Sequence, residues 1–137
     1  MKINPKIHNL VISKITGLTW SQLFLQSPKL TNDQQSKLES MTQRFHDWEP
    51  LEYILEQANF YGVDLFIDNR VLVPRNDTAV MVDQVLKLKI PHFNLIDVWT
   101  GSWAIPIAVN KQCPFVQNTI AIDLSQEALE VAKINAK

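Results

Sequence analysis

The sequence has 137 residues, which is enough for about one ordinary domain. It is 46% hydrophobic and 20% charged, a composition typical of globular rather than disordered chains. The formal net charge of −1 provides no basic excess, so charge does not favour nonspecific binding of nucleic acid.

Several classes of protein are disfavoured by simple counts. The single cysteine, Cys113, excludes an internal disulfide and is weakly typical of a reducing compartment. The N-terminal residues lack the apolar run of a signal peptide, and no segment approaches the roughly 20 apolar residues of a membrane span. Three scattered histidines predict no metal site. We therefore expect a soluble, cytoplasmic protein that does not associate with membranes.

Residues 5–48 have the periodicity of a small helical unit. Gly17 stands near the end of the first helix, and Thr19 and Thr31 are placed to cap the next two. On the helix from Asn32 to Asp47, the residues Leu38, Met41 and Phe45 form the expected inner stripe. We predict no chemistry in this unit.

Beyond Glu49 and Pro50 we expect a helical turn or two and then a β-hairpin. The period changes to two from Phe60 to Ile67, and Asp68–Asn69 is the predicted turn into a second strand, Arg70–Val73. Pro74 would end the hairpin, and Asp77 would cap a helix that runs to Lys87.

The most informative stretch runs from Asn94 to Asp123. A short strand ends near Asp97, a tight turn follows at residues 100–102, a helix opens at Ala104, and a second strand covers residues 119–122. In open parallel sheets, ligands bind beyond the carboxyl ends of the strands, and an acid after the second strand takes ribose hydroxyls. The spacing predicts such a site, with Asp97, Thr100, Gly101, Ser102 and Asp123 as its binding residues. A last helix is expected to begin at Ser125.

The same stretch resembles the first S-adenosylmethionine (AdoMet) motif of class I methyltransferases, Asp-x-Gly-x-Gly-x-Gly. Gly101 keeps one of the three glycines, whereas Trp99 and Trp103 replace the other two. An indole at either position adds bulk where the amino-acid tail of the cofactor would lie. Loss of the motif is the favoured interpretation, and an aromatic wall for an adenine or another ligand is the alternative.

Five ordered phrases resemble the glutamine methyltransferases that modify peptide-chain release factors, the HemK/PrmC family. They are Arg44 with Glu-Pro-x-x-Tyr-Ile at 49–54, Phe-Tyr-Gly at 60–62, Val-Leu-Val-Pro-Arg at 71–75 continued by Asn76, Asp77 and Thr78, the turn at 97–105, and the segment 123–129. The resemblance implies an α/β fold with a helical unit (1–48), a hairpin linker (49–74) and an incomplete Rossmann-like AdoMet domain (75–137).

The resemblance also implies an activity, methyl transfer from AdoMet to the side-chain amide of a release-factor glutamine. Arg75 and Thr78 would form part of the substrate wall, and Trp99 and Trp103 would lie at the cofactor. The family holds the substrate amide with an Asn-Pro-Pro-Tyr loop, which this sequence does not contain. We therefore assign no catalytic residue and expect the chain to be inactive alone.

Only two parallel strands follow the hairpin, and a two-stranded nucleotide fold leaves a bare hydrophobic edge. We expect either a fragment of a longer sequence, which is favoured, or a sheet that another chain completes. The alternative to the enzyme is a non-catalytic module that binds release factors or self-associates. A methyltransferase of nucleic-acid amines is a third, weaker hypothesis, disfavoured by the neutral charge and the hairpin phrases.

Overall fold

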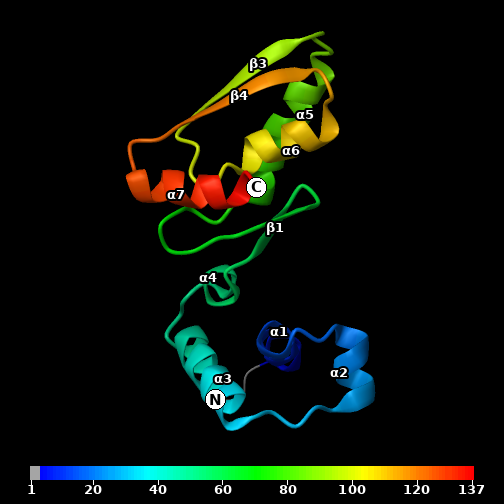
Figure 1. Cartoon of the computed structure of the whole chain (residues 1–137), viewed down its shortest axis with the longest axis vertical. Coiled ribbons are helices and arrows are strands. Elements are labelled where there is room, and N and C mark those ends of the chain that lie inside the picture. Colours follow the sequence, from blue (N-terminus) through cyan, green and yellow to red (C-terminus); the bar gives the residue numbers. More distant parts are fainter. Residues whose placement is uncertain (1–3) are drawn as a thin grey trace. The chain divides into compact units, whose positions relative to one another are not determined.

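The computed structural model describes residues 4–137 and forms two compact units, of which the first ends at Leu55 and the second begins at Glu56 (Figure 1). The expected mixture of helices and strands is confirmed. The strands form two separate two-stranded sheets, so the described residues contain no complete Rossmann-like sheet. None of the helices in this part of the chain combines the length and hydropathy needed to cross a membrane.

The first unit consists of four helices whose starts are set by local capping. They are α1 (Pro5–Thr16), α2 (Trp20–Gln26), α3 (Asn32–His46) and α4 (Leu51–Leu55). The predicted caps Thr19 and Thr31 are confirmed, and each forms a complete capping box with the glutamine three residues later. Gly17 ends α1 in the left-handed conformation, as its position predicted.

The interior of the first unit is small. Val11 and Ile54 are fully or almost fully buried, and Leu38 of the predicted inner stripe is buried as well. The Arg44 guanidinium donates to both carboxylate oxygens of Glu49, at 2.7 and 2.5 Å. This bond lowers the pKa of Glu49 and joins α3 to the segment before α4.

The second unit begins with a β-hairpin, but its strands and its turn are not the ones predicted between residues 60 and 73. Strand β1 (Ala58–Phe60) pairs antiparallel with β2 (Val63–Leu65), so the turn is Tyr61–Gly62. Both turn residues have positive φ, 52° and 72°, the conformation that lets a two-residue loop follow the twist of its strands.

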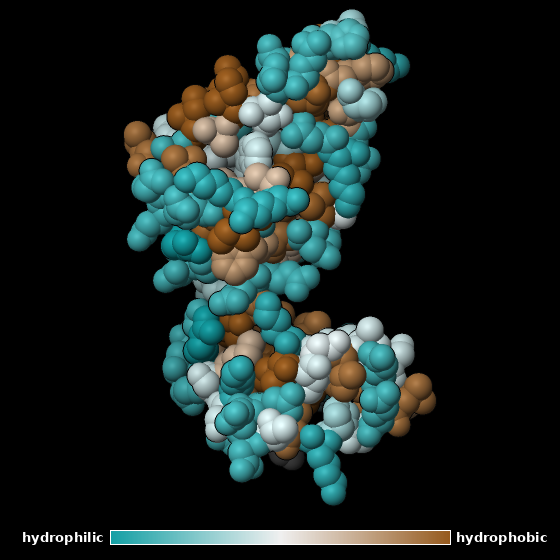
Figure 2. Space-filling model, in the orientation of Figure 1, coloured by the Kyte–Doolittle hydropathy of each residue, from teal (hydrophilic) through white to brown (hydrophobic). Residues whose placement is uncertain are grey.

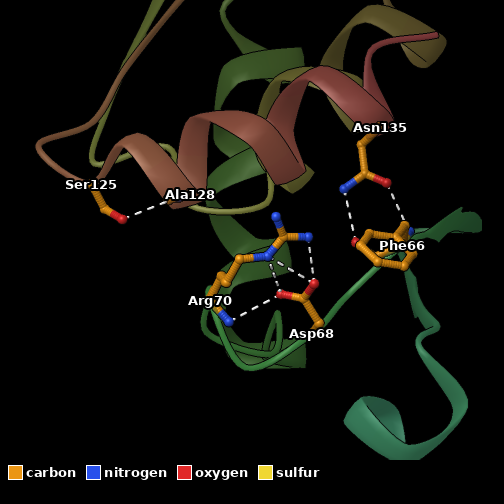
Figure 3. A network of polar contacts seen from close by, with 6 residues as sticks. All are labelled: Phe66, Asp68, Arg70, Ser125, Ala128 and Asn135. Carbon is orange, nitrogen blue, oxygen red and sulfur yellow. Dashed lines mark hydrogen bonds and ion pairs between the residues drawn. The ribbon is translucent and has the colours of Figure 1, made fainter.

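The predicted turn at Asp68–Asn69 does not join two strands, and residues 70–73 are not a strand, so both assignments were wrong. The physical reason is a local hydrogen-bonded loop. The Asp68 carboxylate accepts from the backbone N–H of Arg70 at 3.0 Å and from its guanidinium (Figure 3). The Val71 N–H also donates to the Asp68 carbonyl. Such aspartate-centred turns compete with strand pairing for the same backbone groups.

The rest of the second unit is a strand–helix–strand–helix arrangement. A 3-10 turn, η1 (Asn76–Thr78), leads into α5 (Ala79–Lys87); then follow β3 (Phe93–Val98), α6 (Ala104–Gln112), β4 (Val116–Ile122) and α7 (Gln126–Asn135). The expectation of adjacent parallel strands is confirmed, with Ile96 opposite Ile120 and Val98 opposite Ile122. The Ser125 hydroxyl caps α7, as predicted. Asp77 caps no helix, because it lies inside η1.

Helices cover only one face of the β3–β4 sheet. Val82, Val109 and Val131, from α5, α6 and α7, are completely buried, and Figure 1 shows these three helices on the same side of the strands. The opposite face carries side chains that are about half exposed, Ile96, Val98, Ile120 and Ile122. Hydrophobic side chains also reach the surface of this unit in Figure 2. Parallel sheets normally have both faces covered, so this apolar face is unusual.

The hairpin is fastened to this arrangement by side chains from three helices. The Tyr61 hydroxyl donates to Asp83 of α5 at 2.6 Å, and Lys111 of α6 donates to the Gly62 carbonyl at 3.0 Å. Asn135 of α7 accepts from the Phe66 N–H at 2.7 Å and donates to the Phe66 carbonyl at 3.0 Å (Figure 3).

Candidate functional site

The loop from β3 into α6 has an unusual backbone. Residues 99, 101 and 103 all have left-handed φ, at 64°, 51° and 67°. Only the middle one, Gly101, lacks a Cβ; the other two are Trp99 and Trp103. An L-residue in this region costs roughly 1–2 kcal/mol, so glycine is the residue expected at each of the three positions. The chain thus keeps the backbone of a glycine-rich turn although tryptophan occupies two of its glycine positions.

Hydrogen bonds tie this turn to the end of the neighbouring strand. The Thr100 N–H donates to the Ile122 carbonyl at 3.1 Å, and the Gly101 N–H donates to a carboxylate oxygen of Asp123 at 2.9 Å. Within the turn, the Trp103 N–H donates to the Thr100 carbonyl at 2.8 Å. Behind it, Asn135 donates to the carbonyl of the buried Ser102 at 2.9 Å. The two predicted strand-end segments therefore meet at one turn.

The two predicted acids have pKa values displaced in opposite directions. Burial raises the pKa of Asp97, although the Thr100 hydroxyl donates to its carboxylate at 2.5 Å, and the charge of Asp123 adds to the increase. Backbone N–H groups of Ser125 and Gly101 lower the pKa of Asp123. Asp123 is therefore the firmly anionic member of the pair, and Asp97 takes up a proton more readily than an ordinary aspartate.

A cavity of about 320 Å³ opens beside this turn. Its walls come from the end of β3, the turn, the start of α6, the segment before α5, and three apolar side chains. All the residues that line the cavity are Phe60, Leu72, Val73, Pro74, Arg75, Thr78, Met81, Asp97, Val98, Trp99, Thr100, Gly101, Ser102, Ala104 and Ile105. Seven of the nine predicted site residues are thus brought together, including Arg75 and Thr78 from a distant part of the sequence.

The other two predicted site residues, Trp103 and Asp123, do not line this cavity. The Trp103 indole nitrogen is buried and has no hydrogen-bond partner within residues 4–137. Asp123 touches the site through the Gly101 N–H. Trp99 lines the cavity but is 78% exposed. The cavity is present with both indoles in place, and Trp99 forms part of its wall.

The apolar part of the wall could not be read from the sequence. Phe60 is buried in the hairpin and also lines the cavity. Leu72 and Met81 are 70% and 57% exposed, and both line the cavity. The one available signal was their place at the family phrase of residues 71–78, because Leu72 lies inside it and Met81 follows shortly after it.

The donor set of the cavity fits a zwitterionic nucleoside such as AdoMet. Ala104 and Ile105 begin α6, where backbone N–H groups lack intrahelical acceptors and attract an anion, and Arg75 adds a cation. Asp97 suits a cationic group, and the side chains of Phe60, Leu72 and Met81 suit an apolar ring. By contrast, no cluster of three or more His, Cys, Asp or Glu side chains within residues 4–137 is placed to hold a metal ion.

Several known proteins are similar to this chain in sequence. The family model of the PrmC N-terminal domain matches residues 8–55, and the match ends where the first compact unit ends. Over 82% of this chain, the release factor glutamine methyltransferase of Streptococcus pneumoniae is 39% identical. Proteins of the same name from Thermodesulfovibrio yellowstonii and Buchnera aphidicola are 33% and 34% identical, over 93% and 96% of the chain. The chain spans 40%, 45% and 49% of the lengths of these three relatives. Over most of its length, the chain is thus similar to part of these release factor glutamine methyltransferases, and its first unit is similar to the PrmC N-terminal domain.

Proposed function

We propose that the second unit supplies the AdoMet-binding part of a protein glutamine methyltransferase that acts on release factors, and that the helical unit docks the release factor. The observation that supports this proposal is the convergence of two separate family phrases on one cavity. Arg75 and Thr78 come from one phrase, and Asp97 and Thr100 come from the other. Their distance in sequence makes a chance meeting at one wall a poor explanation.

Each polar group of the site would contact a different part of AdoMet. The Ser102 N–H and the first N–H groups of α6 would donate to the carboxylate of the cofactor, with Arg75 beside them. The Gly101 N–H is already occupied by Asp123, whose remaining lone pairs would accept from the ribose hydroxyls. Asp97 would attract the amino group, and Thr78 would face the substrate side. Bound AdoMet would supply an electrophilic methyl group for transfer to an amide nitrogen.

This chain alone would bind AdoMet but would not transfer the methyl group. An amide nitrogen is a weak nucleophile and must be held in line with the methyl group, which is catalysis by positioning. The 137 residues contain no Asn-Pro-Pro-Tyr, the sequence that the family resemblance gives this task. The substrate amide would therefore need groups that this chain does not supply.

Calorimetric titration with AdoMet tests the proposal. We expect affinity in the micromolar range for the wild-type chain and a loss of about ten-fold or more for Asp123→Ala, because a charged hydrogen-bond acceptor is removed. Asp33→Ala, on the exposed first turn of α3 in the other unit, is the matched control and should bind as wild type. Affinity of millimolar or weaker for the wild-type chain would refute the cofactor assignment.

A second candidate is a non-catalytic module that binds release factors or associates with itself. The uncovered sheet face favours it, since Ile96, Val98, Ile120 and Ile122 are exposed side by side. Sedimentation velocity of the wild-type chain and of Ile120→Lys would reveal self-association through this face. A pulldown with purified release factor, with and without AdoMet, would separate docking from cofactor binding.

A further inference from the structure

Trp99 is an aromatic side chain with no evident structural role in the described part of the chain. It is 78% exposed and belongs to neither of the ring contacts there, which are Phe45–His46 and His92–Phe115. It also holds a left-handed φ of 64°, which glycine would adopt without strain. Packing therefore gives no reason for an indole at this position.

The indole nevertheless lines the cavity of the candidate site, two residues after Asp97. The face of an indole ring carries negative electrostatic potential and attracts cations within about 6 Å of the ring centre. Asp97 acts in the same sense whenever it is ionised. This part of the wall thus favours a positive charge, whereas Arg75 and the start of α6 favour a negative one.

We infer that Trp99 is a specificity-determining residue whose ring face contacts the positively charged sulfonium of AdoMet. The inference rests on the proposed function. Its consequence is a preference for the charged methyl donor over S-adenosylhomocysteine, the product that remains after methyl transfer. These two ligands share the adenosine and the amino-acid tail and differ at sulfur, which is a cationic sulfonium in one and a neutral thioether in the other.

Paired calorimetric titrations of both ligands test this role, and the measured quantity is the ratio of their affinities. Trp99→Leu keeps an apolar side chain and the strained backbone but removes the ring, so the preference for AdoMet should fall roughly two- to five-fold, as for an exposed cation–π contact. Trp99→Phe should lie between the two. Trp48→Leu is the matched control, because Trp48 is 91% exposed with a φ of 67° in the other unit, and its ratio should equal that of wild type.

The possible outcomes are distinct. An equal loss of affinity for both ligands in Trp99→Leu would mean that the indole contacts a part they share, such as the adenine, and would overturn the inference. An unchanged ratio with retained binding would overturn it as well and leave the proposed function standing. Failure of the wild-type chain to bind either ligand would overturn the proposed function and this inference together. Thermal melts of each variant would verify that it is folded.

Discussion

Replacing Trp99 with glycine should stabilise the second unit. The backbone at this position has a φ of 64°, where a Cβ crowds the neighbouring carbonyl, and the side chain is 78% exposed. Removing the side chain therefore relieves backbone strain and exposes little buried surface. Most substitutions of a tryptophan destabilise a protein, so a gain in stability would be a specific result.

The expected magnitude follows from two opposing contributions. Relief of the left-handed conformation is worth roughly 1–2 kcal/mol. Glycine gives the unfolded chain more freedom, which offsets about 0.4–1 kcal/mol of that gain. The net stabilisation should be about 0.5–1 kcal/mol. For a unit of this size, the midpoint of thermal unfolding should then rise by roughly 3–6 °C.

Urea denaturation followed by far-ultraviolet circular dichroism is the suitable assay, because tryptophan fluorescence itself changes in the variant. Trp99→Ala is the matched control, since alanine removes the indole but keeps the Cβ and its strain. Glycine should exceed alanine in stability by about 0.5–1 kcal/mol. If alanine were as stable as glycine or more so, the strain assigned to this turn would be wrong.

Three further predictions concern other parts of the chain. Asn135→Ala should destabilise the second unit by about 1–3 kcal/mol, because it removes hydrogen bonds to both backbone groups of Phe66, and urea denaturation would measure this; an unchanged midpoint would contradict it. In a carboxyl carbon NMR titration, Asp123 should titrate below and Asp97 above the ordinary value of 3.8. Asp123 then contributes stability that is present above pH 3.8 and lost as pH falls through its lowered pKa. The Asp97 contribution has the opposite sign, since it is present below pH 3.8 and lost as pH rises through its raised pKa. Equal midpoints for the two acids would refute both assignments. Thr31→Ala should cost about 1 kcal/mol in the first unit through the loss of the α3 cap, whereas Thr31→Ser should be close to wild type.

The helices were predictable because their start signals are local. Thr19, Thr31 and Ser125 each bond to a backbone N–H three residues later, so a few adjacent residues contain the whole cause. Asp77 was assigned by the same rule and failed. A 3-10 turn begins at Asn76, so Asp77 lies inside a helical turn and not ahead of one.

The hairpin shows where local reasoning stops. Alternation of side chains predicted a strand through Tyr61–Gly62, and tyrosine is not an expected residue for a left-handed turn position. Its φ of 52° is supported by a distant contact, the hydrogen bond from its hydroxyl to Asp83. Partners 22 residues apart leave no signal in a window of turn residues.

The turn at the candidate site was also only partly predictable. The positions of Asp97, Gly101 and Asp123 could be anticipated from spacing, because parallel strands bring their carboxyl ends together. By contrast, spacing could not predict that the turn would form with Trp99 and Trp103 in it. Two strained residues cost roughly 2–4 kcal/mol together, which is a large fraction of the stability of a small unit.

The strained backbone is held in place by hydrogen bonds that do not involve the tryptophan side chains. The Thr100 and Gly101 N–H groups are held by the Ile122 carbonyl and the Asp123 carboxylate, and the carbonyl of Ser102 is held by Asn135. At roughly 0.5–1.5 kcal/mol each, and more for the bond to the charged acid, three such bonds are comparable with the strain. The backbone of this turn is thus imposed from β4 and α7, and glycine is not needed to produce it. A turn can therefore keep three left-handed residues although two of them are tryptophan, and a cavity remains beside it.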